Sequence, residues 1–483
     1  MVSRKTSKKY QKSLQKRQRD FIFSKQAQFA PVTRDQIHGA DYLLDQIEPY
    51  VELLKNFNAS SGQYKDFFKC VMFAGPPGTG KTYFARYVAT AVGNARFVSV
   101  REFPRAHPAE PWTAGDVKKL WELLRKYVAS NECPIVLFWD QFDSFIEDNG
   151  ATDQLYVELD GIRGRPNGIL FISATTADPE EDFDEQLMRA GRFSPTDVIE
   201  FQPPTRKGRV GIFRFYFDQK PHDDFGADVF AYLMHNHSTP ADIYGLVESA
   251  FERAVLRAQS EKSDAKIEKR DLVAAIVSYL VGRPGVSAAE IAEDKLLKTA
   301  VHELGHALVA RRNGWPVRLI SVIARKENLG MTFFDFGAPE DVWTFDNARD
   351  VIAALFGGSA AQIVAGYEKD EGAKKDCEQA TGVAKFFVDQ LGGGTGTHAM
   401  YGSANLENFS IIKSEKMKIL AEDDVGRILK EEEERAEKIL RDIGEKNILA
   451  MARVLIKEKV LLGEEFEALI ARHGIDVKPA RVF

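Results

Sequence analysis

Two short segments of this 483-residue chain place reactive side chains at spacings that suit chemistry. GPPGTGKT, at Gly75–Thr82, combines flexible glycines with a lysine and a threonine, as a loop that wraps phosphate groups requires. HELGH, at His302–His306, places two imidazoles four residues apart with a glutamate beside the first. The first segment indicates a nucleoside-triphosphate site, and the second indicates a zinc ion that activates water. Together they predict that ATP hydrolysis drives peptide-bond hydrolysis.

The phosphate motif is specific because of the elements expected around it. An apolar strand, Cys70–Ala74, precedes the loop, and a helix, Thr82–Val92, follows it. The lysine can neutralise the outer phosphates, the threonine hydroxyl can bind Mg²⁺, and the helix N-terminus adds its positive dipole end. We therefore expect ATP to contact Gly75, Pro76, Pro77, Gly78, Thr79, Gly80, Lys81 and Thr82.

An acidic position follows a second apolar strand, Pro134–Trp139. Asp140 is expected to order Mg²⁺ through its water shell. Gln141 comes next, where ATPases of this type usually carry a glutamate that activates the attacking water. An amide can orient water but cannot take its proton, and losing a general base costs about 10²- to 10⁴-fold in rate. We expect ATP binding to survive and hydrolysis to be slowed.

Two arginines follow the strands of the nucleotide fold. Arg189 and Arg192 lie three residues apart within Gln186–Phe193, on one side of a helical turn. Their rigid donors suit the γ-phosphate of a nucleotide held by a neighbouring subunit. A pair of surface arginines is the alternative, and their position after the strands favours a role with the nucleotide.

The second motif predicts a metal centre on a helix. At a spacing of four, the imidazoles of His302 and His306 point the same way and can hold one zinc ion. Glu303, beside them, can take a proton from water. A third protein ligand is needed. Asp376 is a better candidate than the remaining histidines, although spacing alone does not select it among many carboxylates.

The elements that must position these residues fall into a clear order. Strands alternate with helices as far as about residue 205, which predicts a parallel sheet covered on both faces. Helical signals follow, with a hinge expected at Arg283–Gly285, and the zinc motif lies in a long helix, Ala288–Arg312. We expect a multidomain chain: a basic flexible tail (1–30), an α/β P-loop nucleotide-binding domain (31–205), a helical lid (206–284) and a mainly α-helical zinc metallopeptidase domain (285–483).

Composition narrows the class of protein. A net charge of −6 gives no general attraction for nucleic acid, so no nucleic-acid partner is expected. Three dispersed cysteines indicate a reducing compartment, the cytoplasm or the matrix side of an organelle. The sequence has no apolar run of about 18 residues that could span a membrane. Residues 1–19 carry eight Lys or Arg and no acid, and contact with a membrane surface is an alternative to a free tail.

The chain resembles the FtsH family of AAA+ zinc proteases, from about Val32 to about Leu469. The resemblance is carried by GPPGTGKT, LMRAGRF, HELGHALV, FGGSAAQIVAG and KKDCEQAT, in that order. It implies an AAA+ module with a helical lid, arginine fingers that act across a ring homo-hexamer, and processive degradation of unfolded or membrane proteins. It also implies zinc bound by His302, His306 and Asp376, with Glu303 as the catalytic glutamate.

Several positions depart from the family pattern. Family members usually carry N-terminal transmembrane helices, so the chain is expected to be a soluble relative or a truncated form. The pore-loop Phe-Val-Gly is not recognisable in Ser99–Gly115, where Trp112 or Phe103 could replace the gripping aromatic or could pack locally. Thr176 stands where an asparagine sensor is usual and can still bond to water or phosphate, and Gln362 replaces a common glutamate.

These departures leave more than one function open. The first hypothesis is an ATP-dependent zinc metalloendopeptidase that unfolds and degrades polypeptides. The second is a hexameric remodelling assembly that binds ATP with little turnover and has an energy-independent peptidase activity. Gln141 fits either an engineered ATP trap or a naturally divergent ATPase. A nucleic-acid-dependent ATPase is disfavoured because it leaves HELGH and Asp376 unexplained.

Overall fold

The chain folds into two units that are built on different plans. The computed structural model describes residues 2–24, 30–57, 66–131, 133–146, 149–161, 167–189, 191–282, 292–323, 329–335, 344–369, 371–390 and 415–481. The first unit is Met1–His222 with His235–Glu248, and the second is Asp223–Met234 with Ser249–Phe483. The division falls within the segment expected to be a lid, and the expected hinge at Arg283–Gly285 lies outside the described residues.

The first unit is organised by a five-stranded parallel sheet. The strand order is β2-β3-β4-β1-β5. Its strands are β1 Phe68–Ala74, β2 Arg96–Ser99, β3 Ile135–Trp139, β4 Ile169–Thr175 and β5 Val198–Glu200. Successive side chains of a strand point to opposite faces, so Met72 enters one apolar core and Phe73 the other. The interior strand β3, Ile-Val-Leu-Phe-Trp, is accordingly apolar and buried at every position, as a sheet covered on both faces requires.

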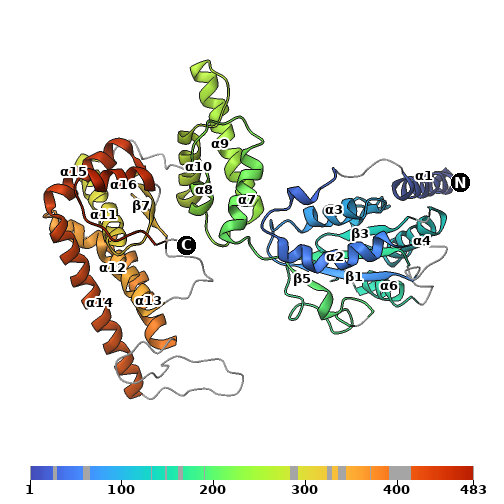
Figure 1. Cartoon of the computed structure of the whole chain (residues 1–483). Helices are drawn as coiled ribbons and strands as arrows, with labels where there is room; N and C mark the ends of the chain where they lie inside the picture. The colour runs from blue at the N-terminus through green and yellow to red at the C-terminus, as the bar shows by residue number, and fades with distance from the viewer. Residues whose placement is uncertain are drawn as a thin grey trace. The chain divides into compact units, whose positions relative to one another are not determined.

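Helices cover both faces of this sheet (Figure 1). One face is covered by α2 Asp41–Lys55 and α3 Lys81–Val92. The other is covered by α4 Ala114–Asn131, α5 Phe142–Ile146 and α6 Asn149–Leu159. The unit also contains α7 Arg206–Phe217, the start of α9 Pro240–Glu261, and 3₁₀ turns at Arg34–Gln36, Val100–Glu102 and Pro195–Asp197.

The N-terminal segment differs from the expected flexible tail. Val2–Phe23 forms a helix, α1, at the start of the first unit. Ile22 is fully buried in the core on the α4 face, and the Gln18 side-chain amide donates to the Pro104 carbonyl oxygen at 2.9 Å. Most of the segment is basic and polar, and the apolar residues that contact the core are confined to its last turn. The overall composition therefore did not predict that this end packs against the domain.

The second unit is mainly helical. Its helices are α8 Asp228–Leu233, the end of α9, α10 Lys269–Val281, α11 Glu293–Arg312, α12 Phe345–Val364, α13 Lys374–Gln390, α14 Glu415–Ile443, α15 Glu445–Glu458 and α16 Gly463–Arg472, with a 3₁₀ turn at Glu371–Ala373. A small antiparallel sheet has the order β7-β6-β8, with β6 Val317–Ser321, β7 Met331–Phe334 and β8 Val460–Leu462. Among the described helices, none is long and apolar enough to cross a membrane.

Two helices of this unit approach each other at paired glycines. A Cβ atom added to Gly305 of α11 would lie 2.1 Å from the carbonyl oxygen of Gly357 on α12. A Cβ added to Gly357 would lie 2.5 Å from the Gly305 carbonyl oxygen. Only glycine allows backbones this close, and the contact sets the separation of the helix that carries HELGH from its neighbour.

This contact predicts a stability defect. Gly305→Ala should lower the free energy of unfolding by about 1–3 kcal/mol, because the added methyl overlaps the Gly357 carbonyl and overpacks the helix interface. Gly382→Ala on α13 is the control, since nothing lies within 4 Å of its added Cβ, and helix propensity alone should raise stability slightly. Denaturant unfolding measures both; equal stabilities would contradict the close approach.

Candidate functional site

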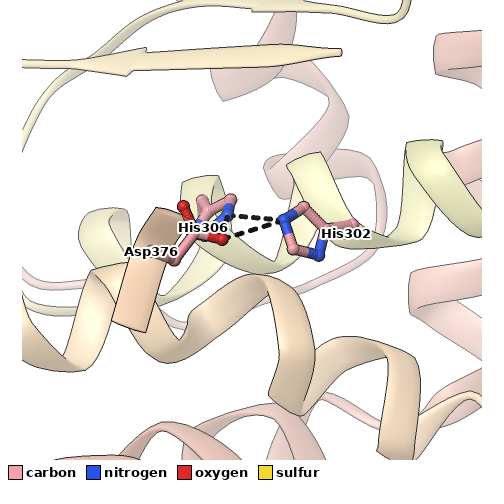
Figure 2. A group of neighbouring side chains, drawn as sticks. All are labelled: His302, His306 and Asp376. Atoms are coloured by element: carbon pink, nitrogen blue, oxygen red, sulfur yellow. Dashed lines mark hydrogen bonds and ion pairs between the residues drawn. The ribbon is translucent and has the colours of Figure 1, made fainter. Parts of the chain in front are cut away.

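Three side chains from two helices converge in the second unit, as Figure 2 shows. His302 Nε2 lies 3.0 Å from His306 Nε2 and 3.1 Å from Asp376 Oδ2. His306 Nε2 lies 3.3 Å from the same carboxylate oxygen. Tetrahedral zinc, with ligands about 2.0–2.1 Å away, separates its donor atoms by about 3.3 Å. The two nitrogens and one oxygen therefore fit three corners of a zinc site and leave the fourth open.

The surrounding helices orient the two imidazoles. His306 Nδ1 lies 2.8 Å from the Ala354 carbonyl oxygen of α12, and a proton donated there leaves Nε2 free to bind a metal. A Cβ on Gly358 would lie 2.5 Å from His306 Nε2 and from His302 Cε1, so the glycine provides the space for both rings. Asp376 comes from the first turn of α13, and Figure 2 shows its carboxylate next to the two imidazoles.

Electrostatics couple the carboxylate to the imidazoles. Burial works against the ionised form of Asp376, but its bonds to His302 and His306 hold its pKa well below the usual range. Burial likewise opposes charge on His306, and the neighbouring carboxylates overcome it and raise the pKa of His306 to about 8. The Asp376 carboxylate is therefore ionised at neutral pH. A metal ion that binds here would displace the proton held by His306.

Glu303 lies next to this cluster on α11. It is buried, and burial raises the pKa of its carboxyl although the two histidines oppose the shift. The Thr332 hydroxyl of β7 lies 2.7 Å from Glu303 Oε2. A carboxyl with its pKa shifted in this direction holds an accepted proton more readily than an exposed glutamate does. Thr332 was not among the residues expected from sequence, because strand pairing alone brings it to α11.

The glycine-rich loop of the first unit joins β1 to α3. Gly75 has a φ of +141°, and a Cβ there would lie 2.2 Å from the Phe201 carbonyl oxygen. Lys81 Nζ donates to the carbonyl oxygens of Gly75 and Pro76 at 2.5 and 2.9 Å, so it lies within the loop. The start of α9 is close by, since Ala241 N–H donates to the Gly78 carbonyl at 3.3 Å. The sequence pattern did not indicate that contact.

The carboxyl ends of β3 and β4 bring further polar groups to the same sheet edge. Asp140 Oδ2 accepts from the Thr82 hydroxyl at 3.4 Å, which pairs the two residues expected to bind Mg²⁺. Gln141 is exposed and has a φ of +53°, an uncommon backbone conformation for a residue with a long side chain. Thr176 is exposed just beyond β4, while the buried Thr175 donates to Asp143 Oδ1 at 3.0 Å.

The two arginines converge on one carboxylate. Arg192 grips Asp160 with two bonds of 2.9 and 2.8 Å, lies 3.9 Å over the Tyr156 ring, and has a nearly buried side chain. Arg189 reaches the same carboxylate at 3.2 Å, but half of its side chain is exposed. The pair is thus unequal: one guanidinium is locked in its own subunit and the other faces solvent.

Two aromatic side chains of the segment expected to contain a pore loop pack against the core of the first unit. Phe103 is buried and stacks on Trp112 at a centroid distance of 6.2 Å, and Trp112 lies 4.9 Å from Trp139. Both aromatics therefore pack locally. A cavity of about 380 Å³ lies beside them and is lined in part by Arg105 and Gln141.

Comparison with known proteins places both halves of the chain. Residues 71–201 match the ATPase family associated with various cellular activities (AAA), and residues 289–469 match peptidase family M41. ATP-dependent zinc metalloprotease FtsH 3 of Symbiobacterium thermophilum is 30% identical, over 91% of this chain and 71% of that protein. The chain belongs to the FtsH family. FtsH of Kosmotoga olearia is 29% identical over 91% of this chain and 69% of its own, and FtsH of Thermotoga maritima is 28% identical over 91% and 73%.

Membership of the FtsH family confirms the principal expectations from sequence. The chain is an ATP-dependent zinc metalloprotease with an AAA module on a parallel sheet and a mainly helical M41 peptidase domain. FtsH proteins use Zn²⁺ for proteolysis and ATP with Mg²⁺ in the AAA module. FtsH proteins are typically hexameric and act on proteins.

The donor geometry predicts a zinc-binding defect. Asp376→Asn should lower zinc content from about one ion per chain to well below half after dialysis against a mild chelator, because three protein ligands become two. Glu378→Gln, an exposed position on the same helix, is the matched control and should keep its zinc. Elemental analysis measures both, and full zinc occupancy in Asp376→Asn would exclude that carboxylate as a ligand.

Proposed function

We propose that this chain degrades unfolded or partly folded polypeptides as a homo-hexamer, with His302, His306 and Asp376 as its zinc ligands and Glu303 as its proton carrier. The observation that carries the proposal is the convergence of three donor atoms, 3.0–3.3 Å apart, beside a buried glutamate. Two histidines and a carboxylate with one open position are typical of catalytic zinc and not of structural zinc.

The chain's own residues supply the proton transfers of peptide hydrolysis. Zinc, when bound, acts as a Lewis acid toward water and the peptide carbonyl. Glu303 takes a proton from water as the water oxygen bonds to the carbonyl carbon. Glu303 then returns that proton to the amine nitrogen as the carbon–nitrogen bond breaks. Its burial and raised pKa suit both halves of this exchange.

The nucleotide site is proposed to bind ATP–Mg²⁺ firmly and to hydrolyse it slowly. Gly75–Thr82 would wrap the phosphates, and Thr82 with Asp140 would hold the metal ion. Thr176, beyond β4, would contact the γ-phosphate or the attacking water. Gln141 can orient that water but cannot accept its proton. This last step is where we expect the chain to differ from ATPases with glutamate there.

Of the two arginines, Arg189 is proposed as the finger that reaches a neighbouring subunit's nucleotide. Its side chain is half exposed and makes only long contacts to Asp160. Arg192 is held by two short bonds to Asp160 and by a carbonyl bond to Gln186, and it would position the turn that presents Arg189. Arg189 would thus act at the subunit interface, and Arg192 would support it from within its own subunit.

A reducing compartment and a membrane-surface contact complete the proposal. The three cysteines are free, and Cys70 is buried. Residues 1–19 carry eight basic residues and no acid, so an anionic lipid surface would attract this end of α1. Neither feature alters the chemistry of the two sites.

The second candidate function, a remodelling assembly with little ATP turnover, is favoured by one observation. Gln141 directly follows Asp140, at the position where ATPases of this type usually carry a glutamate, while Thr82 and Asp140 are paired as Mg²⁺ binding requires. In that case ATP would hold the assembly together and the peptidase would cut loosely folded chains without energy. Casein digestion separates the two functions. Cleavage that stops with a nonhydrolysable ATP analogue supports the first, and equal cleavage supports the second.

Glu303→Gln tests the proposed proton carrier. The substitution should lower casein cleavage by about 10²- to 10⁴-fold, because the amide cannot accept the proton from water. Zinc content and ATP binding should stay at wild-type levels, since neither depends on this carboxyl. Glu293→Gln, in the exposed first turn of the same helix, should leave cleavage unchanged. Persistent proteolysis in Glu303→Gln would show that the assignment is wrong.

Gln141→Glu tests the slow ATPase. Restoring a carboxylate should raise the steady-state rate of ATP hydrolysis by about 10²-fold or more, while the affinity for ATP changes little. Phosphate release and nucleotide titration measure the two quantities on the same preparations. An unchanged rate would show that another group already activates the water.

A further inference from the structure

The Glu303 side chain projects from α11 and is contacted by a residue of the small sheet. The Thr332 hydroxyl oxygen lies 2.7 Å from Glu303 Oε2 and 2.8 Å from the Glu303 backbone carbonyl oxygen. Within the described residues, Thr332 provides the only side-chain hydrogen bond to this carboxyl. Antiparallel pairing of Thr332 with Ile320 of β6 fixes the position of the hydroxyl.

The other carboxyl oxygen is confined by the residue that precedes β7. A Cβ added to Gly330 would lie 2.7 Å from Glu303 Oε1 and 2.6 Å from Glu303 Cγ. The backbone at Gly330 therefore closes one side of the glutamate, and Thr332 bonds the other oxygen. Two residues of one strand region thus leave this side chain little freedom to rotate.

We propose that Thr332 is a positioning residue for peptide hydrolysis, whose hydroxyl holds the Glu303 carboxyl in the place from which it exchanges protons with water and the leaving amine. This rests on the proposed role of Glu303. A hydroxyl is one donor and also an acceptor, and it can rotate between partners. It donates to the carboxylate before proton transfer. While Glu303 carries the proton on its other oxygen, the hydroxyl continues to donate to Oε2.

The arrangement explains why a threonine suits this position. Thr332 is partly buried, and its hydroxyl lies within hydrogen-bond distance of two oxygens of one residue. Valine would keep the shape and lose both bonds, and serine would keep the bonds and lose the methyl. The two substitutions therefore separate positioning from packing.

Thr332→Val and Thr332→Ser are the test pair, assayed in the full chain with an internally quenched peptide and with casein. Thr332→Val should lower kcat by about 10- to 100-fold and leave KM within about twofold, because a lost bond to a charged group is worth about 1.5–3 kcal/mol. Thr332→Ser should keep at least about half of the wild-type kcat. Zinc content, thermal unfolding midpoint and ATPase rate should match wild type in both variants.

Each outcome decides for or against the inference. Wild-type kcat in Thr332→Val would overturn it, as would equal losses in the valine and serine variants or loss of zinc from Thr332→Val. Gly330→Ala supplies a second route, because its added methyl should displace Glu303 and lower kcat while zinc is retained. If wild type and all variants fail to cleave either substrate, the proposed function fails rather than the role of Thr332.

Discussion

The close packing of α11 on α12 is the constraint on which the peptidase site depends. Gly305 and Gly357 let the two backbones meet without intervening side chains. At that separation the imidazoles of His302 and His306 fit against Gly358, and the Ala354 carbonyl reaches His306 Nδ1. Asp376 can then complete the donor set from α13. Larger residues at the crossing would move the histidines away from the groups that orient them.

The sequence predicted the local elements and the ligands well, because both follow from short-range rules. The helix Asp41–Lys55 and the strand ahead of the glycine loop were expected from apolar spacing, and β1 begins only two residues earlier than expected. HELGH predicts its own geometry, since helical periodicity places its imidazoles together. Asp376 lies seventy-four residues from His302 along the chain, and only the resemblance to a family singled it out.

Features that depend on tertiary contacts could not be predicted from the sequence. Thr332 reaches Glu303 through strand pairing, and nothing in the sequence around it signals a catalytic neighbour. Likewise, the docked end of α1 rests on Ile22 and Gln18, while the basic residues before them indicated a free tail. The unequal roles of Arg189 and Arg192 also emerge only from their shared partner, Asp160. In each case the deciding partner is distant in sequence.

The central claim is that two imidazole nitrogens and one carboxylate oxygen bind a catalytic zinc ion on the packed helix pair. X-ray absorption at the zinc edge of the purified protein tests it most directly. The account predicts only light donors, nitrogen and oxygen, at about 2.0–2.2 Å, with two imidazole rings in the outer-shell scattering. A sulfur donor at about 2.3 Å, which would implicate Cys377 beside Asp376, or a single imidazole ring, would contradict it.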